Sequence, residues 1–195
     1  MANRKFFLDR PIERLIIISR TRDRIEALAA RIRATPELAG LDLEIEMAAD
    51  DAVADADVIT TVTRATTPLF DGARVKPGAH INLGGDMRRQ DREVDDALAR
   101  RAIFFLDEDE SCRLRAGDIV LAIDGGALEE SWIRGEIGAV LAGRLEGRLG
   151  EDEITVFKSL GIATQDLCLS AALLDKAAAE DASTDFDPIT GVVSG

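Results

Sequence analysis

The sequence predicts an α/β fold built on a doubly wound, mainly parallel sheet with helices on both faces. Two observations lead to this prediction. Short β-branched runs, such as residues 15–18 and 79–83, alternate with segments whose apolar residues recur at helical spacing. The two patterns alternate roughly every 20 residues, which is typical of strand–helix–strand units and therefore of a parallel sheet.

The first half of the chain gives this pattern most clearly, because its apolar runs are short and well separated. Strands are expected over residues 15–18, 41–45, 56–62, 79–83 and 102–106. Helices are expected over residues 22–32, 50–54 and about 92–101.

Beyond residue 106 the pattern is weaker. A helix is expected over 132–141, a strand over 153–157 and a long amphipathic helix over 161–180. Residues 182–195 have no periodicity and are interpreted as a loose tail. We therefore expect a single domain over residues 1–181, with no linker that divides it.

The chain is acidic, with 24 basic and 37 acidic residues and a net charge of −13. This charge argues against nucleic acid and anionic membrane as partners. No apolar run approaches the ~20 residues that span a bilayer, and the 46% of hydrophobic residues is enough for a sizeable core. Residues 1–34 alone are basic, with nine basic and four acidic side chains. That stretch is either an anion site or a solvated helix face.

The two cysteines, Cys112 and Cys168, lack C-x-x-C spacing and are too few for a disulfide framework. Two cysteines without disulfide spacing fit a reducing compartment. The N-terminal residues include no apolar segment of the kind that signal peptides carry. We therefore expect a cytoplasmic location.

Ligands of a doubly wound sheet lie beyond the carboxyl ends of its strands, so the residues after each apolar run are site candidates. The first run is followed by Ser19, Arg20, Thr21 and Arg22. In a dinucleotide site a carboxylate there binds the ribose 2′-hydroxyl, whereas arginine and small hydroxyls accommodate a 2′-phosphate. These residues favour NADP, but they fit an ordinary capped helix N-terminus equally well.

The end of the run over residues 56–62 supplies further cofactor-site candidates. Thr61, Val62 and Thr63 are small enough to let a cofactor approach closely. His80, the only histidine, lies inside a strand pattern and is interpreted as structural. This interpretation leaves no Ser–His or metal–His scheme.

The next run ends in a glycine pair. Asn82 and Gly84 precede Gly85 and Asp86, and glycines relieve steric limits on the backbone at a strand end. Asp86 is the best candidate for an acid–base residue, with a turn or helix-cap aspartate as the alternative. The acidic run 107–110 lacks the periodicity of a calcium loop and is interpreted as a solvated turn. No metal is predicted.

These motifs occur in an order that resembles the ornithine cyclodeaminase/mu-crystallin family of NAD(P)-dependent enzymes. The resemblance covers roughly residues 10–180. Among the blocks that carry it are Arg10-Pro11-Ile12-Glu13-Arg14, Ala56-Asp57-Val58-Ile59-Thr60-Thr61-Val62-Thr63, Lys76-Pro77-Gly78-Ala79-His80-Ile81-Asn82 and Ile154-Thr155-Val156-Phe157-Lys158-Ser159-Leu160-Gly161-Ile162-Ala163.

The resemblance implies a Rossmann-type domain that binds NAD or NADP, with Asp86 as the catalytic residue. It also adds Ser159, Leu160 and Gly161 to the cofactor-binding candidates, near the nicotinamide. The implied reaction converts L-ornithine to L-proline and ammonia through an imine that cyclises and is reduced again. Relatives reduce cyclic ketimines and pyrroline carboxylates, or dehydrogenate alanine, so the partner is a small amino acid or cyclic imine.

The family begins with a substrate and dimerisation domain, followed by a strand with a G-x-G-x-x-G turn. Residues 1–9 occupy that place in this sequence and contain no glycine. We therefore expect a sheet without its usual first, central strand, and a truncated member with impaired activity. The main interface of the family homodimer would be missing too. The alternative of another class is a non-catalytic NADP-binding module or an inactive remnant.

Overall fold

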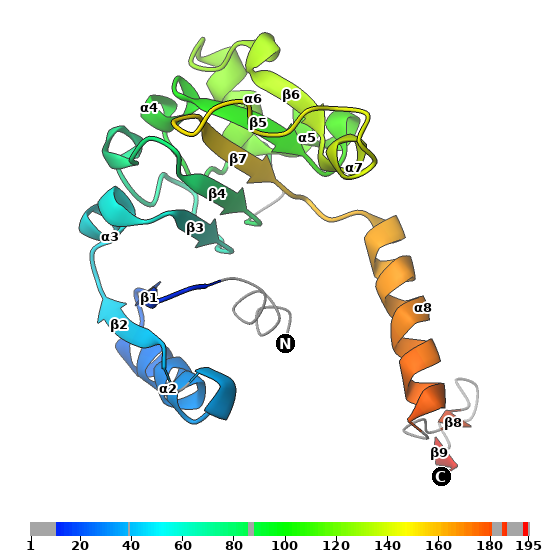
Figure 1. Cartoon of the computed structure of the whole chain (residues 1–195). Helices are drawn as coiled ribbons and strands as arrows, with labels where there is room; N and C mark the ends of the chain where they lie inside the picture. The colour runs from blue at the N-terminus through cyan, green and yellow to red at the C-terminus, as the bar shows by residue number, and fades with distance from the viewer. Residues whose placement is uncertain (1–10, 39, 86–87, 181–184, 187–192, 195) are drawn as a thin grey trace.

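The main feature of the computed structural model is a five-stranded parallel sheet (Figure 1). The structure describes residues 11–38, 40–85, 88–180, 185–186 and 193–194. In spatial order the strands are β3 (Val58–Thr61), β4 (His80–Leu83), β7 (Ile154–Lys158), β5 (Ala102–Leu106) and β6 (Ile133–Glu136). Each neighbouring pair is parallel, as the sequence predicts.

One face of this sheet forms the core. Ile81, Val156 and Phe104 are aligned across β4, β7 and β5, and none of them has exposed surface. They belong to one apolar cluster with side chains of α4 (Asp96–Ala99), α5 (Asp109–Arg115) and α6 (Gly117–Asp124). The short turns η2 (Gly72–Arg74) and η3 (Glu130–Trp132) connect elements at its margin.

A separate two-stranded parallel sheet consists of β1 (Arg14–Ile18) and β2 (Asp42–Glu46). The helix α2 (Arg22–Arg33) and the turn η1 (Pro36–Leu38) connect these strands, and α3 (Ala49–Asp55) leads on to β3. Among the described residues, no strand pairs with both β1 and β3. Within the described ranges, the two sheets are therefore not joined by a shared strand.

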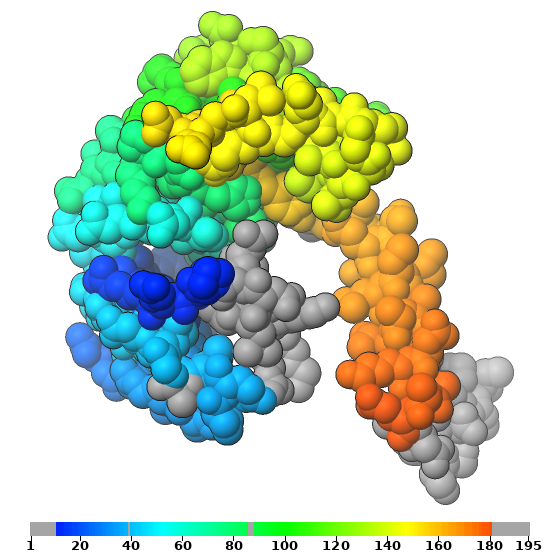
Figure 2. Space-filling model, in the orientation of Figure 1, coloured from blue at the N-terminus to red at the C-terminus, as the bar shows by residue number. Residues whose placement is uncertain are grey.

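The helix α8 (Ala163–Ala179) follows β7 and projects away from both sheets (Figures 1 and 2). It has no buried residue, and its leucines are between 57% and 71% exposed. No helix in the described part of the chain is long and apolar enough to cross a membrane. Where a loose tail is expected, β8 (Asp185–Phe186) and β9 (Val193–Ser194) form a short antiparallel pair.

The helix expected over residues 92–101 is wrong in its first half, because only α4 is helical there. The amides of Glu93 and Val94 donate to Asp118 Oδ1 at 2.6 and 3.2 Å. These long-range hydrogen bonds take both backbone groups out of the helical pattern.

Two further expectations need correction. The segment 132–141 divides into β6, which pairs with β5, and α7 (Ile137–Leu141). Gly135, within β6, has a φ of 142°, which favours glycine. The acidic run 107–110 is not a solvated turn, since Asp107 is buried and Glu108 caps α5. No expectation covers α5 or α6.

Candidate functional site

The carboxyl ends of β3, β4, β7 and β5 form one edge of the sheet, because parallel strands in register end together. Three carboxylates, those of Glu93, Asp118 and Asp107, organise the segments that follow these strands. All three side chains are buried, with exposures of 1%, 2% and 6%. None of the three is among the site residues that the sequence predicts.

Glu93 holds the segment that follows β3. Its carboxylate accepts hydrogen bonds from the hydroxyls of Thr61 and Thr63, each at 2.6 Å, and from the Thr63 amide at 2.8 Å. The hydroxyls predicted to lie near a cofactor are therefore directed at Glu93. The side chain of Val62 between them is 75% exposed.

The close approach of Glu93 depends on the glycine pair after β4. A Cβ at Gly85 would lie 2.2 Å from the carboxyl carbon of Glu93, so any larger residue would displace the carboxylate. Gly84 is exposed, and a Cβ there would be in ordinary contact with Val62 at 3.5 Å. Its amide donates to the Thr61 carbonyl at 2.9 Å. The steric requirement thus falls on Gly85, whereas the sequence predicts the cofactor contact at Gly84.

Asp118 links this segment to the end of β7. Its Oδ2 lies 2.8 Å from Nζ of Lys158, which has no exposed surface, while Oδ1 accepts the amides of Glu93 and Val94. A buried ion pair is tolerated only where its remaining hydrogen-bonding capacity is satisfied. Asp118 meets this condition, so the pair fixes α6, β7 and the Glu93 segment relative to one another.

Asp107 holds the segment that follows β7. Its Oδ2 accepts the Ser159 hydroxyl at 2.9 Å and the amides of Leu160 and Gly161, each at 2.7 Å. Burial would raise the pKa of Asp107, but hydrogen bonds from Cys112, Ser159 and the two amides lower this pKa below its ordinary value. Gly161 has a φ of 80°, a conformation that favours glycine.

Cys112 is part of the same cluster. Its Sγ lies 3.2 Å from Asp107 Oδ1. Burial, together with the adjacent Asp107 carboxylate, raises the pKa of the thiol to about 12. The thiol is therefore protonated at neutral pH and serves as a hydrogen-bond donor rather than a nucleophile.

The contacts of the segment that follows β1 are local. Ser19 Oγ accepts the Thr21 amide at 3.2 Å, and Arg22 pairs with Glu26 at 3.2 Å. Thr21 occupies the N-cap of α2 without a side-chain cap hydrogen bond. Arg20 is exposed, and no side-chain hydrogen bond joins it to the described residues.

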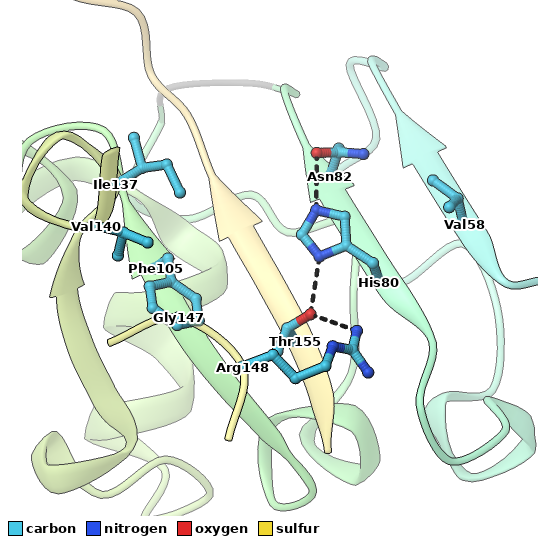
Figure 3. Close-up of a pocket in the computed structure, with 9 residues that line it drawn as sticks. All are labelled: Val58, His80, Asn82, Phe105, Ile137, Val140, Gly147, Arg148 and Thr155. Carbon is cyan, nitrogen blue, oxygen red and sulfur yellow. Dashed lines mark hydrogen bonds between the residues drawn. The ribbon is translucent and has the colours of Figure 1, made fainter. Parts of the chain in front are cut away.

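A pocket of about 410 Å³ lies on the sheet face opposite the core (Figure 3). His80 Nδ1 lies 2.8 Å from Thr155 Oγ1 and His80 Nε2 lies 3.2 Å from Asn82 Oδ1. Arg148 donates to the same Thr155 oxygen at 2.9 Å, and Asn82 donates to Thr60 at 3.3 Å. Hydrogen bonding at both ring nitrogens fits the structural role expected of His80. Asn82, predicted to bind cofactor, belongs to this row of polar side chains.

Asp86, the predicted acid–base residue, lies outside the described residues. The structure brings together the segments after β3, β4 and β7, while the β1 segment belongs to the other sheet. Two of the buried carboxylates could have been suspected from the sequence. Asp107 directly follows a predicted strand, and Gly85, the second glycine of a pair, indicates that another group, here Glu93, approaches closely.

A model of the ornithine cyclodeaminase/mu-crystallin family matches residues 4–181. The chain belongs to this family. Within it, the chain is 33% identical over 172 residues to a Δ1-pyrroline-2-carboxylate reductase of Bacillus cereus, covering 88% of this chain and 52% of that protein. It is 38% identical over 157 residues to the ketimine reductase mu-crystallin of Mus musculus, covering 80% and 45%.

A solved structure of the same family is similar over nearly the whole chain. Δ1-Pyrroline-2-carboxylate reductase of Thermococcus litoralis, in complex with NADH and L-proline, superposes with a TM-score of 0.82 at 26% identity. The superposition covers 95% of this chain and 54% of that one. The family thus has the α/β fold that the sequence predicts, and this chain spans about half the length of the relatives it matches.

Proposed function

We propose that this chain is the cofactor-binding part of an NAD(P)-dependent oxidoreductase that reduces the C=N bond of a cyclic imino acid. The observation that carries the proposal is the shared edge formed by the ends of β3, β4 and β7, in a chain whose superposed relative holds NADH and L-proline. The pyrroline-carboxylate and ketimine reductases among its relatives support this substrate class. When bound, the reduced nicotinamide supplies the hydride that adds to the imine carbon.

Ser19, Arg20, Thr21 and Arg22 are proposed to hold the adenine ribose and its 2′ substituent. The exposed Arg20 guanidinium fits a phosphate, since arginine binds phosphate oxygens through paired hydrogen bonds. Residues 19–22 contain no carboxylate, which is the group that would select a free 2′-hydroxyl. We therefore propose NADP ahead of NAD.

The segments after β3, β4 and β7 are proposed to contact the nicotinamide half. Glu93 and Asp107 hold the segments after β3 and β7 in the free chain, so binding requires little further ordering. The residues assigned to this contact are Thr61, Val62, Thr63, Asn82, Gly84, Ser159, Leu160 and Gly161.

Asp86 is proposed as the acid–base residue. Reduction of an imine places a hydride on carbon and a proton on nitrogen, so one acidic group must lie beside the substrate. A carboxylic acid directly after Gly85 can give that proton and regain it from solvent. Both reaction directions are served by the same group, because the reverse oxidation requires a base at the same nitrogen.

The second candidate function is ornithine cyclodeamination, which converts L-ornithine to L-proline and ammonia through a cyclic imine. The motif blocks shared with the ornithine cyclodeaminase/mu-crystallin family favour it. A candidate of another class is a non-catalytic NADP-binding module. Such a module would bind NADP but would not convert any substrate.

Fluorescence titration with NADPH and NADH tests the proposal. We expect NADPH to bind more tightly than NADH, and Arg20→Glu to weaken NADPH binding by about tenfold, or ~1.4 kcal/mol. Arg24→Glu, at another exposed position of the same region, is the matched control and should leave the affinity unchanged. Failure to bind either nucleotide contradicts the proposal.

Substrate addition then separates the candidates. Oxidation of NADPH by Δ1-pyrroline-2-carboxylate supports the reductase, and ammonia release from L-ornithine supports the cyclodeaminase. Binding without either reaction supports the module. An Asp86→Asn variant that turns over as fast as the parent chain would remove Asp86 from the mechanism.

A further inference from the structure

The turn that follows β7 is held by one buried side chain, that of Asp107. β5 and β7 are parallel neighbours (Figure 1), and Leu106 of β5 pairs with Lys158 of β7. Asp107 is the first residue after β5, and its amide donates to the Lys158 carbonyl at 3.1 Å. Its carboxylate therefore meets residues 159–161 at the carboxyl edge of the sheet.

The Asp107 carboxylate uses its hydrogen-bonding capacity within the protein. Its Oδ2 accepts one hydroxyl and two backbone amides from residues 159–161. Its Oδ1 accepts the Glu108 amide at 2.8 Å and lies 3.2 Å from Cys112 Sγ. A carboxylate has about four lone-pair sites, so these donors leave none for a metal ion or a substrate. Burial raises the pKa of Asp107, but the hydrogen bonds lower it below its ordinary value, so the carboxylate is ionised at neutral pH.

The backbone of this turn has the arrangement of an anion site. The amides of Leu160 and Gly161 converge on one oxygen, and successive amides that converge in this way bind anions. Gly161 has a φ of 80°, and a Cβ there would meet no atom within 4 Å. Glycine is therefore required for the backbone conformation and not for space. α8 begins at Ala163, so its N-terminal dipole adds to the positive potential at both amides.

We propose that Asp107 is the positioning residue of the turn over residues 159–161, and that it acts as a permanent internal anion which reverses the polarity that the turn presents to ligands. Without Asp107, two amides and a hydroxyl would be open to an oxyanion. With Asp107 in place, these hydrogens are directed at a buried carboxylate. The Ser159 amide is also committed, since it donates to the Leu83 carbonyl at 2.9 Å. The groups that remain for a ligand are acceptors, namely the Ser159 Oγ lone pair and backbone carbonyls.

The segment after β3 has the same polarity. Glu93 is 1% exposed and accepts the hydroxyls of Thr61 and Thr63 together with the Thr63 amide. β3 and β7 are the two neighbours of β4, so the segments on both sides of β4 direct donor hydrogens at buried carboxylates. The acceptor character therefore extends across this part of the strand-end edge.

The ligand group that fits the β7 turn is a nitrogen that carries hydrogens, because acceptors and the charge of Asp107 attract N–H groups and repel oxyanions. This step rests on the proposed function, in which two ligand nitrogens qualify. One is the amide nitrogen of the nicotinamide carboxamide, and the other is the protonated imine nitrogen of the substrate. The substrate carboxylate and the cofactor phosphates are expected away from this turn.

Anion rescue of an Asp107→Ala variant tests the internal anion without any nucleotide. We expect exchange of the Leu160 and Gly161 amides in the isotope-labelled variant to be faster than in the parent chain by about tenfold or more. Sodium formate should restore the parent rate saturably, because formate is a carboxylate small enough for the space that the side chain leaves. Sodium chloride at the same ionic strength controls for screening and should have no such effect. The parent chain should not respond to formate, since its turn already holds a carboxylate.

Two further variants separate loss of the anion from a general loss of stability. Ile81→Ala is the matched control, because it opens a cavity in the core without changing the turn. Its Leu160 and Gly161 amides should not respond to formate. Asp107→Asn keeps the shape of the side chain and serves if Asp107→Ala does not fold. We expect its two amides to exchange about threefold faster than in the parent chain, with no response to formate, because the amide side chain still fills the space.

Binding and turnover measurements identify the nitrogen that the turn serves. NADPH affinity that falls about tenfold in Asp107→Ala and recovers with formate assigns the turn to the carboxamide. Unchanged NADPH affinity, with a KM for Δ1-pyrroline-2-carboxylate that rises about tenfold and recovers with formate, assigns it to the imine.

Two results would overturn the role of Asp107 as an internal anion. The Leu160 and Gly161 amides could exchange at the parent rate in Asp107→Ala, or formate could act no differently from chloride. An Asp107→Ala variant that matches the parent chain in both NADPH affinity and KM would overturn its positioning role. A parent chain that does not bind NADPH contradicts the proposed function instead, while the formate dependence of the two amides still decides whether Asp107 is the anion of the turn.

Discussion

The two sheets of this chain differ in how completely their strands are covered. In the five-stranded sheet, β4, β7 and β5 have neighbours on both sides, and Ile81, Val156 and Phe104 are fully buried. In the two-stranded sheet each strand has one neighbour, and no residue of β1 or β2 is buried. Four of the five residues of β1 are apolar, yet none of them is buried, whereas four of the five residues of β5 are buried. Burial here depends on the surrounding partners as well as on the strand's own sequence.

The ion pairs of the two sheets differ in the same way, since one is buried and the other exposed. Breaking the buried pair should give the largest change in the free energy of unfolding. Lys158→Met leaves the Asp118 carboxylate buried without its cation, so we expect a loss of about 3–5 kcal/mol in the free energy of unfolding. Urea denaturation measures it. The matched control is Arg14→Met, which breaks an exposed ion pair with Glu44 in the two-stranded sheet and should change stability little. Equal losses would contradict the contrast.

Isoleucine truncation in the two sheets gives the next effect. Ile81→Ala opens a cavity in the core and should cost about 3 kcal/mol. Ile16→Ala removes a half-buried side chain at a sheet edge and should cost less than half as much. Comparable losses in urea denaturation would mean that the edge of β1 is covered as well as the core strand is.

Asp107→Asn should lower the free energy of unfolding by about 2 kcal/mol at neutral pH, because the amide is a poorer acceptor for two backbone amides and a hydroxyl. The pKa of Asp107 is lowered in the folded chain, so its contribution is present above about pH 3.9 and is lost as the pH falls through the folded pKa. The variant should therefore show a shallower loss of stability in acid. Asp57→Asn, at an exposed carboxylate, should leave the acid slope unchanged.

The smallest predicted change in stability comes from replacing one of two adjacent glycines, Gly84 and Gly85. Gly85→Ala should cost about 1–2 kcal/mol, because the new methyl group meets the Glu93 carboxylate. Gly84→Ala meets Val62 at an ordinary contact distance and should be close to neutral. Thermal unfolding of both variants measures the difference, and the opposite ranking would show that Glu93 can move aside.

Much of this fold could be predicted from local sequence. The strands β1 and β5 are β-branched or aromatic runs, and α2 has apolar residues at helical spacing, so their patterns indicate the elements directly. β6 could not be found in this way, because Ile133–Glu136 contains one apolar residue and depends on β5 for its pairing.

The site was predicted in outline, because strand ends of a parallel sheet indicate where ligands bind. Its supporting carboxylates could not be predicted from local patterns. Glu93 is 32 positions from Thr61, and Asp118 is 40 positions from Lys158. Asp107 opens an acidic run whose sequence predicts a solvated turn, and the fold buries its side chain while Glu108 caps α5.

The five-stranded sheet is more fully paired and buried than the two-stranded sheet. Native-state hydrogen exchange of the free chain at increasing denaturant tests this difference most directly. We predict that the β4, β5 and β7 amides exchange only through global unfolding. The β1 and β2 amides should exchange through a local opening at distinctly lower free energy. One shared opening free energy for both sheets would contradict the account, because it would mean that β1 and β2 are held as firmly as the paired core.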